Sequence, residues 1–242
     1  MAYIGKTPTV APLTSSDVAD GIITNAKLAQ DIISAETALG AEPADTDELL
    51  VSDAGTLKRM DYSHIKASAG WTLISTSTTS SAVSEIDITG IDSTYKVYKI
   101  LIMKLDVATD DAGLNARAII GGSVETGANH PYVAHRVSAQ GTPQHVVVAS
   151  TNATSWKVTH GGIGNHAMEA CSGELTIYNP SETSHYTTIG VSMHYQDPTQ
   201  LAGWSAGTLH YNEEPLVALT GIRFMPSSGN IESAVIKLYG LS

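Results

Sequence analysis

The sequence predicts an all-β protein: an antiparallel β-sandwich of jelly-roll type, preceded by a mostly extended N-terminal segment. From Trp71 onward, strand-sized runs alternate with turn residues at intervals of about 8 to 12 positions. The chain has one Phe against ten Tyr and three Trp, with only 15% charged residues, and such a composition favours strands. No helical pattern separates the runs, so a parallel sheet with crossover helices is excluded.

Residues 1–69 are predicted to form a separate N-terminal domain that becomes ordered only on partner chains. Asn25 is a candidate N-cap of a short helix in which Leu28, Ile32 and Ile33 fall at helical spacing. The apolar stripe is thin, and so short a helix is unstable alone in water. A hairpin is predicted next, with its turn at Asp53-Ala54-Gly55, and an isolated hairpin is also marginal.

Residues 70–242 are predicted to form the C-terminal β-sandwich domain. In the run 95–105, apolar Val97, Ile100 and Ile102 interleave with lysines, which is typical of a half-buried strand. The predicted strands lie within the runs 71–78, 82–88, 95–105, 114–120, 132–137, 144–150, 154–160, 171–178, 185–195, 203–211, 216–225 and 232–241.

Charge and targeting features restrict the partners. A formal net charge of -11 repels nucleic acid and anionic membrane surfaces, so neither is an expected partner. No apolar stretch approaches the length of a membrane span, and the N-terminus lacks the apolar core of a secretion signal, which predicts synthesis in the cytoplasm of the producing cell. Cys171 is the only cysteine, so an internal disulfide is excluded, and we interpret it as a buried small apolar residue.

Phrases at both ends of the chain resemble a known family. The opening MAYIGKTPTVAPLTSSDVADGIITNAKLA and the later DELLVSDAGTLKRMDYSHIKA are similar to N-terminal segments of tail-fibre and related appendage proteins of tailed, notably marine, bacteriophages. SGELTIYNPSETSHY and RFMPSSGNIESAVIKLYGLS resemble the C-terminal β domain of such proteins. The resemblance implies a homotrimer located in the virion, which fastens to other virion proteins of the tail or head through residues 1–69 and displays its β domain outward.

One motif has the form of a hydrolase signature. Gly203-Trp204-Ser205-Ala206-Gly207 satisfies G-x-S-x-G, but that elbow needs a following helix and a later histidine. Strand-like sequence follows instead, and no histidine lies beyond His210. We therefore predict no catalytic residue here and interpret Gly203 and Gly207 as strand residues beside a packed Trp204.

Metal and cofactor sites are not predicted. The nine histidines are spread singly, and no His-x-His pair occurs that would place two ligands on one strand face. Asp106, Asp110 and Asp111 form an oxygen-rich loop without EF-hand spacing, which we interpret as a solvated turn. A metal gathered around a threefold axis, with one histidine from each subunit, is a pattern that the sequence of one chain does not reveal.

Sugar binding is the remaining site hypothesis. Aromatic and amide side chains on sandwich loops stack on pyranose rings and hydrogen-bond to them, and by side-chain type the candidate contacts are Tyr132, Trp156, Tyr211 and Asn212. Together with the resemblance, the sequence leads us to expect a structural, non-enzymatic virion component, a tail fibre or a short spike or adaptor, for which a host surface glycan is a candidate partner. The alternatives are a head-decoration fibre, a polysaccharide-degrading tailspike and a free carbohydrate-binding module.

Overall fold

The computed structural model describes residues 35–65, 70–139 and 144–241, together with positions 14, 16, 18 and 19. The chain divides into two compact units, residues 1–66 and residues 67–242, whereas the sequence predicts a boundary after Ala69. The predicted helix around Asn25 lies outside the described residues. Among the residues described, no helix is long and apolar enough to cross a bilayer.

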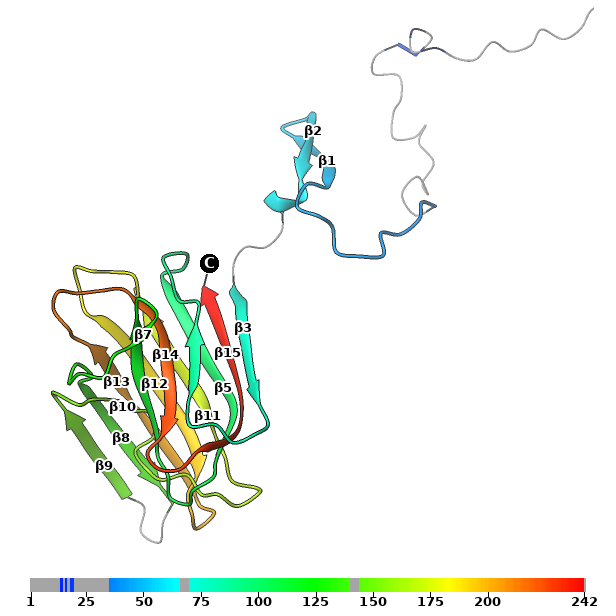
Figure 1. Ribbon diagram of the computed structural model, residues 1–242. Coiled ribbons are helices and arrows are strands. Elements are labelled where there is room, and N and C mark those ends of the chain that lie inside the picture. The colour runs from blue at the N-terminus through cyan, green and yellow to red at the C-terminus, as the bar shows by residue number, and fades with distance from the viewer. Residues whose placement is uncertain are drawn as a thin grey trace, which may run out of the picture. The chain divides into compact units, whose positions relative to one another are not determined.

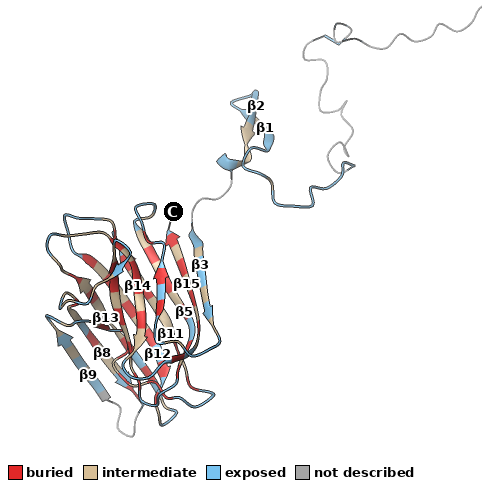
Figure 2. Ribbon diagram, viewed as in Figure 1, coloured by how far each residue is buried: buried red, intermediate tan, exposed pale blue. Residues whose placement is uncertain are grey.

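The described part of the first unit contains the predicted hairpin. Strand β1 (Glu48–Asp53) pairs antiparallel with β2 (Thr56–Asp61). The two-residue turn has positive φ at both Ala54 (50°) and Gly55 (84°), the conformation that matches the twist of the flanking strands. A 3-10 turn, η3 (Tyr62–His64), follows. None of the described residues of this unit is buried (Figure 2), so the hairpin prediction is confirmed but the unit has no core in these residues.

The second unit consists of two antiparallel sheets (Figure 1). The large sheet has eight strands in the order β3-β15-β5-β11-β12-β13-β8-β9, and the small sheet has the order β10-β6-β14-β4, with β7 paired to β6. Large-sheet strands are β3 (Trp71–Thr79), β5 (Val97–Val107), β8 (Tyr132–Ser138), β9 (Gln144–Ser150), β11 (Cys171–Tyr178), β12 (Thr187–Gln196), β13 (Ala202–Tyr211) and β15 (Ile231–Leu241). Small-sheet strands are β4 (Ile86–Thr89), β6 (Leu114–Ile120), β7 (Ser123–Val124), β10 (Trp156–Lys157) and β14 (Leu219–Pro226).

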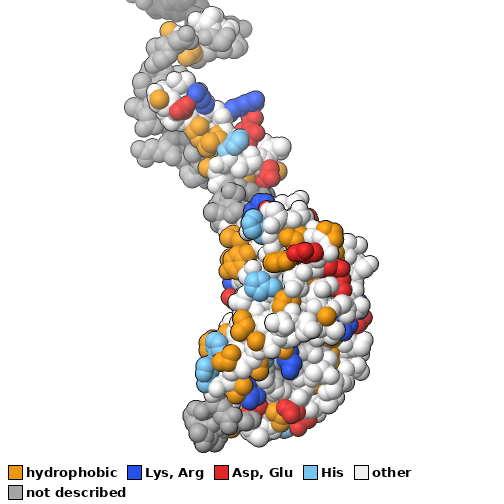
Figure 3. Space-filling view, turned by 90° about the vertical axis from the view of Figure 1, so that its left-hand side faces the viewer, with side chains coloured by type: hydrophobic (Ala, Val, Ile, Leu, Met, Phe, Trp, Pro, Cys, Tyr) orange, Lys and Arg blue, Asp and Glu red, His pale blue; other side chains and the backbone are white. Residues whose placement is uncertain are grey.

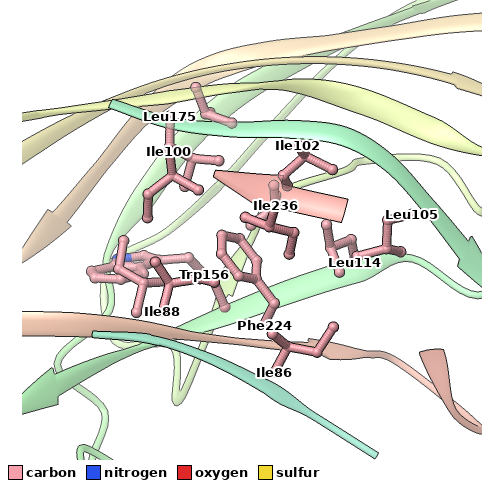
Figure 4. Packing of buried hydrophobic residues seen from close by; sticks show 14 of the residues in the cluster. Ile86, Ile88, Ile100, Ile102, Leu105, Leu114, Trp156, Leu175, Phe224 and Ile236 are labelled. Atoms are coloured by element: carbon pink, nitrogen blue, oxygen red, sulfur yellow. The ribbon is translucent and has the colours of Figure 1, made fainter. Parts of the chain in front are cut away.

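The core fills the space between the two sheets. Figure 4 shows side chains of the large sheet, such as Ile100 and Leu175, pointing toward Phe224, Ile88 and Trp156 of the small sheet. All five are at most 2% exposed. Alternating side chains of each strand supply this layer, because successive residues of a strand point to opposite faces.

Strand β5 shows how a bulge changes the alternation. Tyr98, Ile100 and Ile102 are buried, but Met103 and Lys104 are both exposed before burial resumes at Leu105. The pairing of β5 shifts register at this point with both β15 and β11. The extra residue carries the strand back to the core face, a usual consequence of a β-bulge.

The all-β prediction is confirmed, and each of the predicted runs overlaps a strand. The short strand β7 was not predicted, since two residues between glycines and a polar loop carry no periodic signal. The jelly-roll order stays a prediction.

Candidate functional site

Two of the predicted glycan contacts are core residues, and for them the prediction is wrong. Trp156 is fully buried, and its Nε1–H donates to the His210 carbonyl oxygen at 2.7 Å. Tyr211 is 1% exposed, and its hydroxyl donates to the Glu213 carboxylate. Both rings flank His130, whose centroid lies 4.8 Å from that of Trp156. Neither ring has a free face on which a pyranose could stack.

The other two predicted glycan contacts are partly buried. Tyr132 packs against the core, and its ring centroid lies 5.6 Å from that of His160. The backbone N–H of Asn212 donates to the Asn129 carbonyl oxygen at 3.3 Å, and its buried Oδ1 has no hydrogen-bond partner among the described residues. The structure therefore does not bring the four predicted residues together as one exposed aromatic surface.

The G-x-S-x-G motif lies within strand β13, and the described residues after it, 212–241, contain no helix. Ser205 is fully buried, and its Oγ accepts a hydrogen bond of 3.0 Å from the backbone N–H of His160. The interpretation of Gly203 as a strand residue is confirmed, because its Cα lies against the Tyr195 ring and an added Cβ would come within 2.4 Å of that ring. Trp204 is not packed as predicted: it is 36% exposed and points to the other side of the sheet.

The described residues contain no group of three or more His, Cys, Asp or Glu side chains that could hold a metal ion. Asp106 pairs with Lys104 at 2.6 Å, and Asp110 Oδ1 accepts the Asn165 N–H at 3.3 Å. Cys171 is buried in β11, as predicted, and burial raises the pKa of its thiol.

The outer face of the large sheet, turned away from the small sheet, is the first candidate binding surface. Strand register aligns its side chains in rows across β9, β8, β13 and β12. One row runs His145, Val137, Trp204, His194, and the adjacent row runs Val147, His135, Ala206, Ser192. Figure 3 shows hydrophobic and histidine side chains gathered along one side of the second unit.

Trp204 is held in place on this face. Its Nε1–H donates to Ser192 Oγ at 3.1 Å, and its ring lies 4.9 Å from the ring of His135, which in turn lies 5.4 Å from that of His145. Beside it, the small residues Gly190 and Ala206 leave a hollow of about 330 Å³ that extends to Tyr178. The face thus offers exposed aromatic rings and, beside them, a shallow depression.

A cleft between the sheets is the second candidate site. We call it the interlayer cleft; it has a volume of about 320 Å³ and is lined by Asp111, Gly113, Asn115, Arg136, Lys157, Thr159, His160, Gly161, Gly162 and Ser227. Arg136 points inward, since its strand neighbours Ala134 and Ser138 are buried and its cross-strand partner is Ser205. His160 is held against the same wall by its hydrogen bond to Ser205.

The interlayer cleft is lined by two basic side chains and a histidine, although the chain as a whole is acidic. Burial, with the nearby charges of Lys157 and Arg136, lowers the pKa of His160 to about 4, so its imidazole is neutral near pH 7. The buried atoms His160 Nε2 and Arg136 Nε have no hydrogen-bond partner among the described residues. Arg136 and Lys157 make no ion pair with any carboxylate in the described part of the chain.

Sequence reasoning missed Trp204, Arg136 and His160 as site residues. For Trp204 a signal existed, because the strand period places it opposite to the core residues Gly203 and Ser205. For Arg136 and His160 no such signal existed, because strand pairing and a loop bring the two residues together and their spacing in the sequence does not indicate it.

In comparisons with known proteins, no family model, curated protein or solved structure matches the chain.

Proposed function

We propose that this chain is a structural component of a virus particle, of the tail-fibre or short-spike kind, that acts by binding and not by turnover. In this proposal three copies pack the outer faces of their large sheets around a shared axis, and residues 1–69 fasten the trimer to other virion proteins. The observation that carries it is the apolar character of that outer face.

The two outer faces of the sandwich differ in chemistry. On the small sheet, Arg223 pairs with Asp87 at 2.7 Å and with Glu85 at 2.6 Å, next to Arg117 on the neighbouring strand. This is the solvated, charged face expected of an antiparallel sheet on water. The large sheet also carries an ion pair on its outer face, between Lys99 and Glu174 at 2.9 Å. In addition it presents a set of apolar side chains that are at least 36% exposed: Trp71, Leu73, Val133, Val137, Val147, Tyr178, Trp204 and Leu241.

Such a collection of apolar side chains on one face favours a covered surface. A monomeric soluble protein rarely exposes a continuous apolar patch of more than a few hundred Å². The two edge strands, β3 and β9, contain no charged or proline residue that would block pairing with another chain. Identical copies are the occupant that we favour, because the hairpin unit also has no buried described residue and gains stability only by assembly.

Sedimentation of the full-length chain at micromolar concentration tests the assembly. We expect a mass near three times 25.4 kDa for the wild type. The double variant Leu73→Lys, Val147→Lys places charges on the outer face and should sediment as a monomer with unchanged circular dichroism. The matched control is Met168→Lys, a 78% exposed loop residue outside the face, which should remain trimeric. A monomeric wild type, or a trimeric double variant, contradicts the proposal.

Particle incorporation tests the attachment role. A chain lacking residues 1–69 should fold as a β-sandwich but should no longer join virus particles. Incorporation of the shortened chain at the level of the full chain would refute the assigned role of this segment. Release of reducing sugar from host polysaccharides by the full chain would instead support the tailspike enzyme alternative.

A further inference from the structure

The interlayer cleft contains a cation, Arg136, that makes no ion pair with a carboxylate among the described residues. Arg136 is partly buried on the inner side of β8, and its Nε has no contact with solvent or with a hydrogen-bond acceptor among the described residues. Removing a guanidinium from water is costly unless it gains charged or well-placed acceptors. Lys157 and His160 line the same cleft, and Asp111, the one carboxylate among its lining residues, makes no ion pair with Arg136.

The interlayer cleft is also lined by groups that suit hydroxyls. Asp111 lies over Gly162, where an added Cβ would come within 1.9 Å of its Oδ1, so the glycine makes room for the carboxylate. Asn115 and Ser227 line the same space. The negative charge of Asp111 in the cleft disfavours a compact multiply charged anion such as phosphate. It favours a ligand with one anionic group, which pairs with Arg136, and hydroxyl donors, which reach Asp111.

We propose that the interlayer cleft binds a sugar acid, a uronate unit whose carboxylate pairs with Arg136 and Lys157 and whose ring hydroxyls hydrogen-bond to Asp111 and Asn115. The planar guanidinium is suited to bidentate carboxylate recognition. The volume of about 320 Å³ is at the lower end for ligand pockets, about 300 to 1,000 Å³, which suits one pyranose ring. The site is separate from the outer face of the large sheet and does not depend on the proposed trimer.

Calorimetric titration of the full-length chain with sodium glucuronate tests this site, with glucose as the uncharged control of the same ring size. We expect glucuronate to bind at about millimolar concentration and glucose at least about tenfold more weakly, since it lacks the charge-assisted hydrogen bonds. Equal binding of both sugars, equal or tighter binding of inorganic phosphate, or no binding of glucuronate would overturn the proposal. Tighter binding of an oligogalacturonate than of galacturonate would identify a polymer as the source of the unit, and equal binding would identify the free sugar acid.

Variants of the cleft residues test whether glucuronate binds in the interlayer cleft. Arg136→Met should weaken glucuronate binding at least about tenfold, and Lys157→Gln should weaken it several-fold. Lys157 is exposed, so its variant tests the site even if Arg136→Met does not fold. Lys237→Gln, on the outer face of the large sheet, removes the same charge elsewhere and should bind as the wild type. In the wild type, glucuronate should also shift the imidazole NMR signals of His160. Unchanged affinity in both cleft variants would refute the site.

Discussion

The Nε2 atom of His130 accepts a hydrogen bond of 3.1 Å from the backbone N–H of Ala118, and both residues are buried. The other ring nitrogen, Nδ1, lies 3.3 Å from the Gly127 carbonyl oxygen, so we assign the proton of the neutral ring to Nδ1. Protonation of Nε2 would remove the acceptor and place a charge beside the Trp156 ring. Burial accordingly lowers the pKa of His130.

Acidification should destabilise the fold over a pH range that is determined by the lowered pKa values of two histidines. The pKa values of His130 and His160 lie below the ordinary 6.5 in the folded state, so the unfolded chain binds more protons as the pH falls from 6.5. Stability should therefore decrease between about pH 6.5 and 4. For His160 the loss is on the order of 1 to 2 kcal/mol after its partial exposure is discounted. Urea unfolding followed by tryptophan fluorescence at several pH values measures it.

Two comparisons separate this effect from that of carboxylates. The hydrogen bond from the Gly127 N–H lowers the pKa of Glu125. Protonation of this carboxylate therefore reduces stability only when the pH falls below its ordinary pKa of 4.5. His130→Gln should be less stable than the wild type at pH 7 and should lose less stability on acidification. The exposed-site control His166→Gln should follow the wild-type curve. A wild-type stability that stays constant from pH 6.5 to 5 would contradict the prediction.

Two glycines of neighbouring strands should respond oppositely to alanine. A Cβ at Gly207 in β13 would come within 2.3 Å of the Val133 carbonyl oxygen and 2.4 Å of Ala134 Cβ, so backbone must move. Gly207→Ala should cost about 2 kcal/mol or more. At Gly190 in β12 no atom lies within 4 Å of the added methyl group, and Gly190→Ala should be neutral or stabilise by about 0.5 kcal/mol. Equal free energies of unfolding for the two variants would refute this packing.

The tryptophans provide a second matched pair. Trp156→Phe removes the donor to the His210 carbonyl oxygen and leaves a cavity in the core, so it should cost about 2 to 3 kcal/mol. Trp71→Phe, at a position that is 41% exposed in the single chain and outside the core between the sheets, should lower the free energy of unfolding less than Trp156→Phe does. Circular dichroism during urea unfolding measures both without using tryptophan as the probe. A Trp71 variant as destabilised as the Trp156 variant would be inconsistent with the assigned core.

The thiol of Cys171 should report unfolding. It is buried in β11, and burial raises its pKa, so little thiolate forms near pH 7 to 8 and the sulfur is inaccessible. In native buffer the thiol should not react with a disulfide reagent over minutes, whereas in urea one equivalent should react at once. Rapid labelling of the native chain would show that β11 opens readily or is not central in the large sheet.

The local pattern of residues was sufficient to predict the strands and the hairpin. Alternation and turn residues act over a few positions, so the runs 95–105 and 171–178 and the turn at Ala54 and Gly55 can be recognised without knowledge of the rest of the chain. The burial of Cys171 also follows from residue type, because an unpaired cysteine is usually a small apolar core residue.

Only the tertiary structure decided which face of each strand meets the core and which distant residues meet one another. Trp156 and Trp204 are chemically identical, but pairing puts the first between the sheets and the second on the outer face of the large sheet. Arg136 and His160 become neighbours because both lie against Ser205, which is distant from each of them in sequence. Residue type determines what a side chain can do, whereas sheet order and register determine where it does it, since these depend on the packing of the whole sandwich.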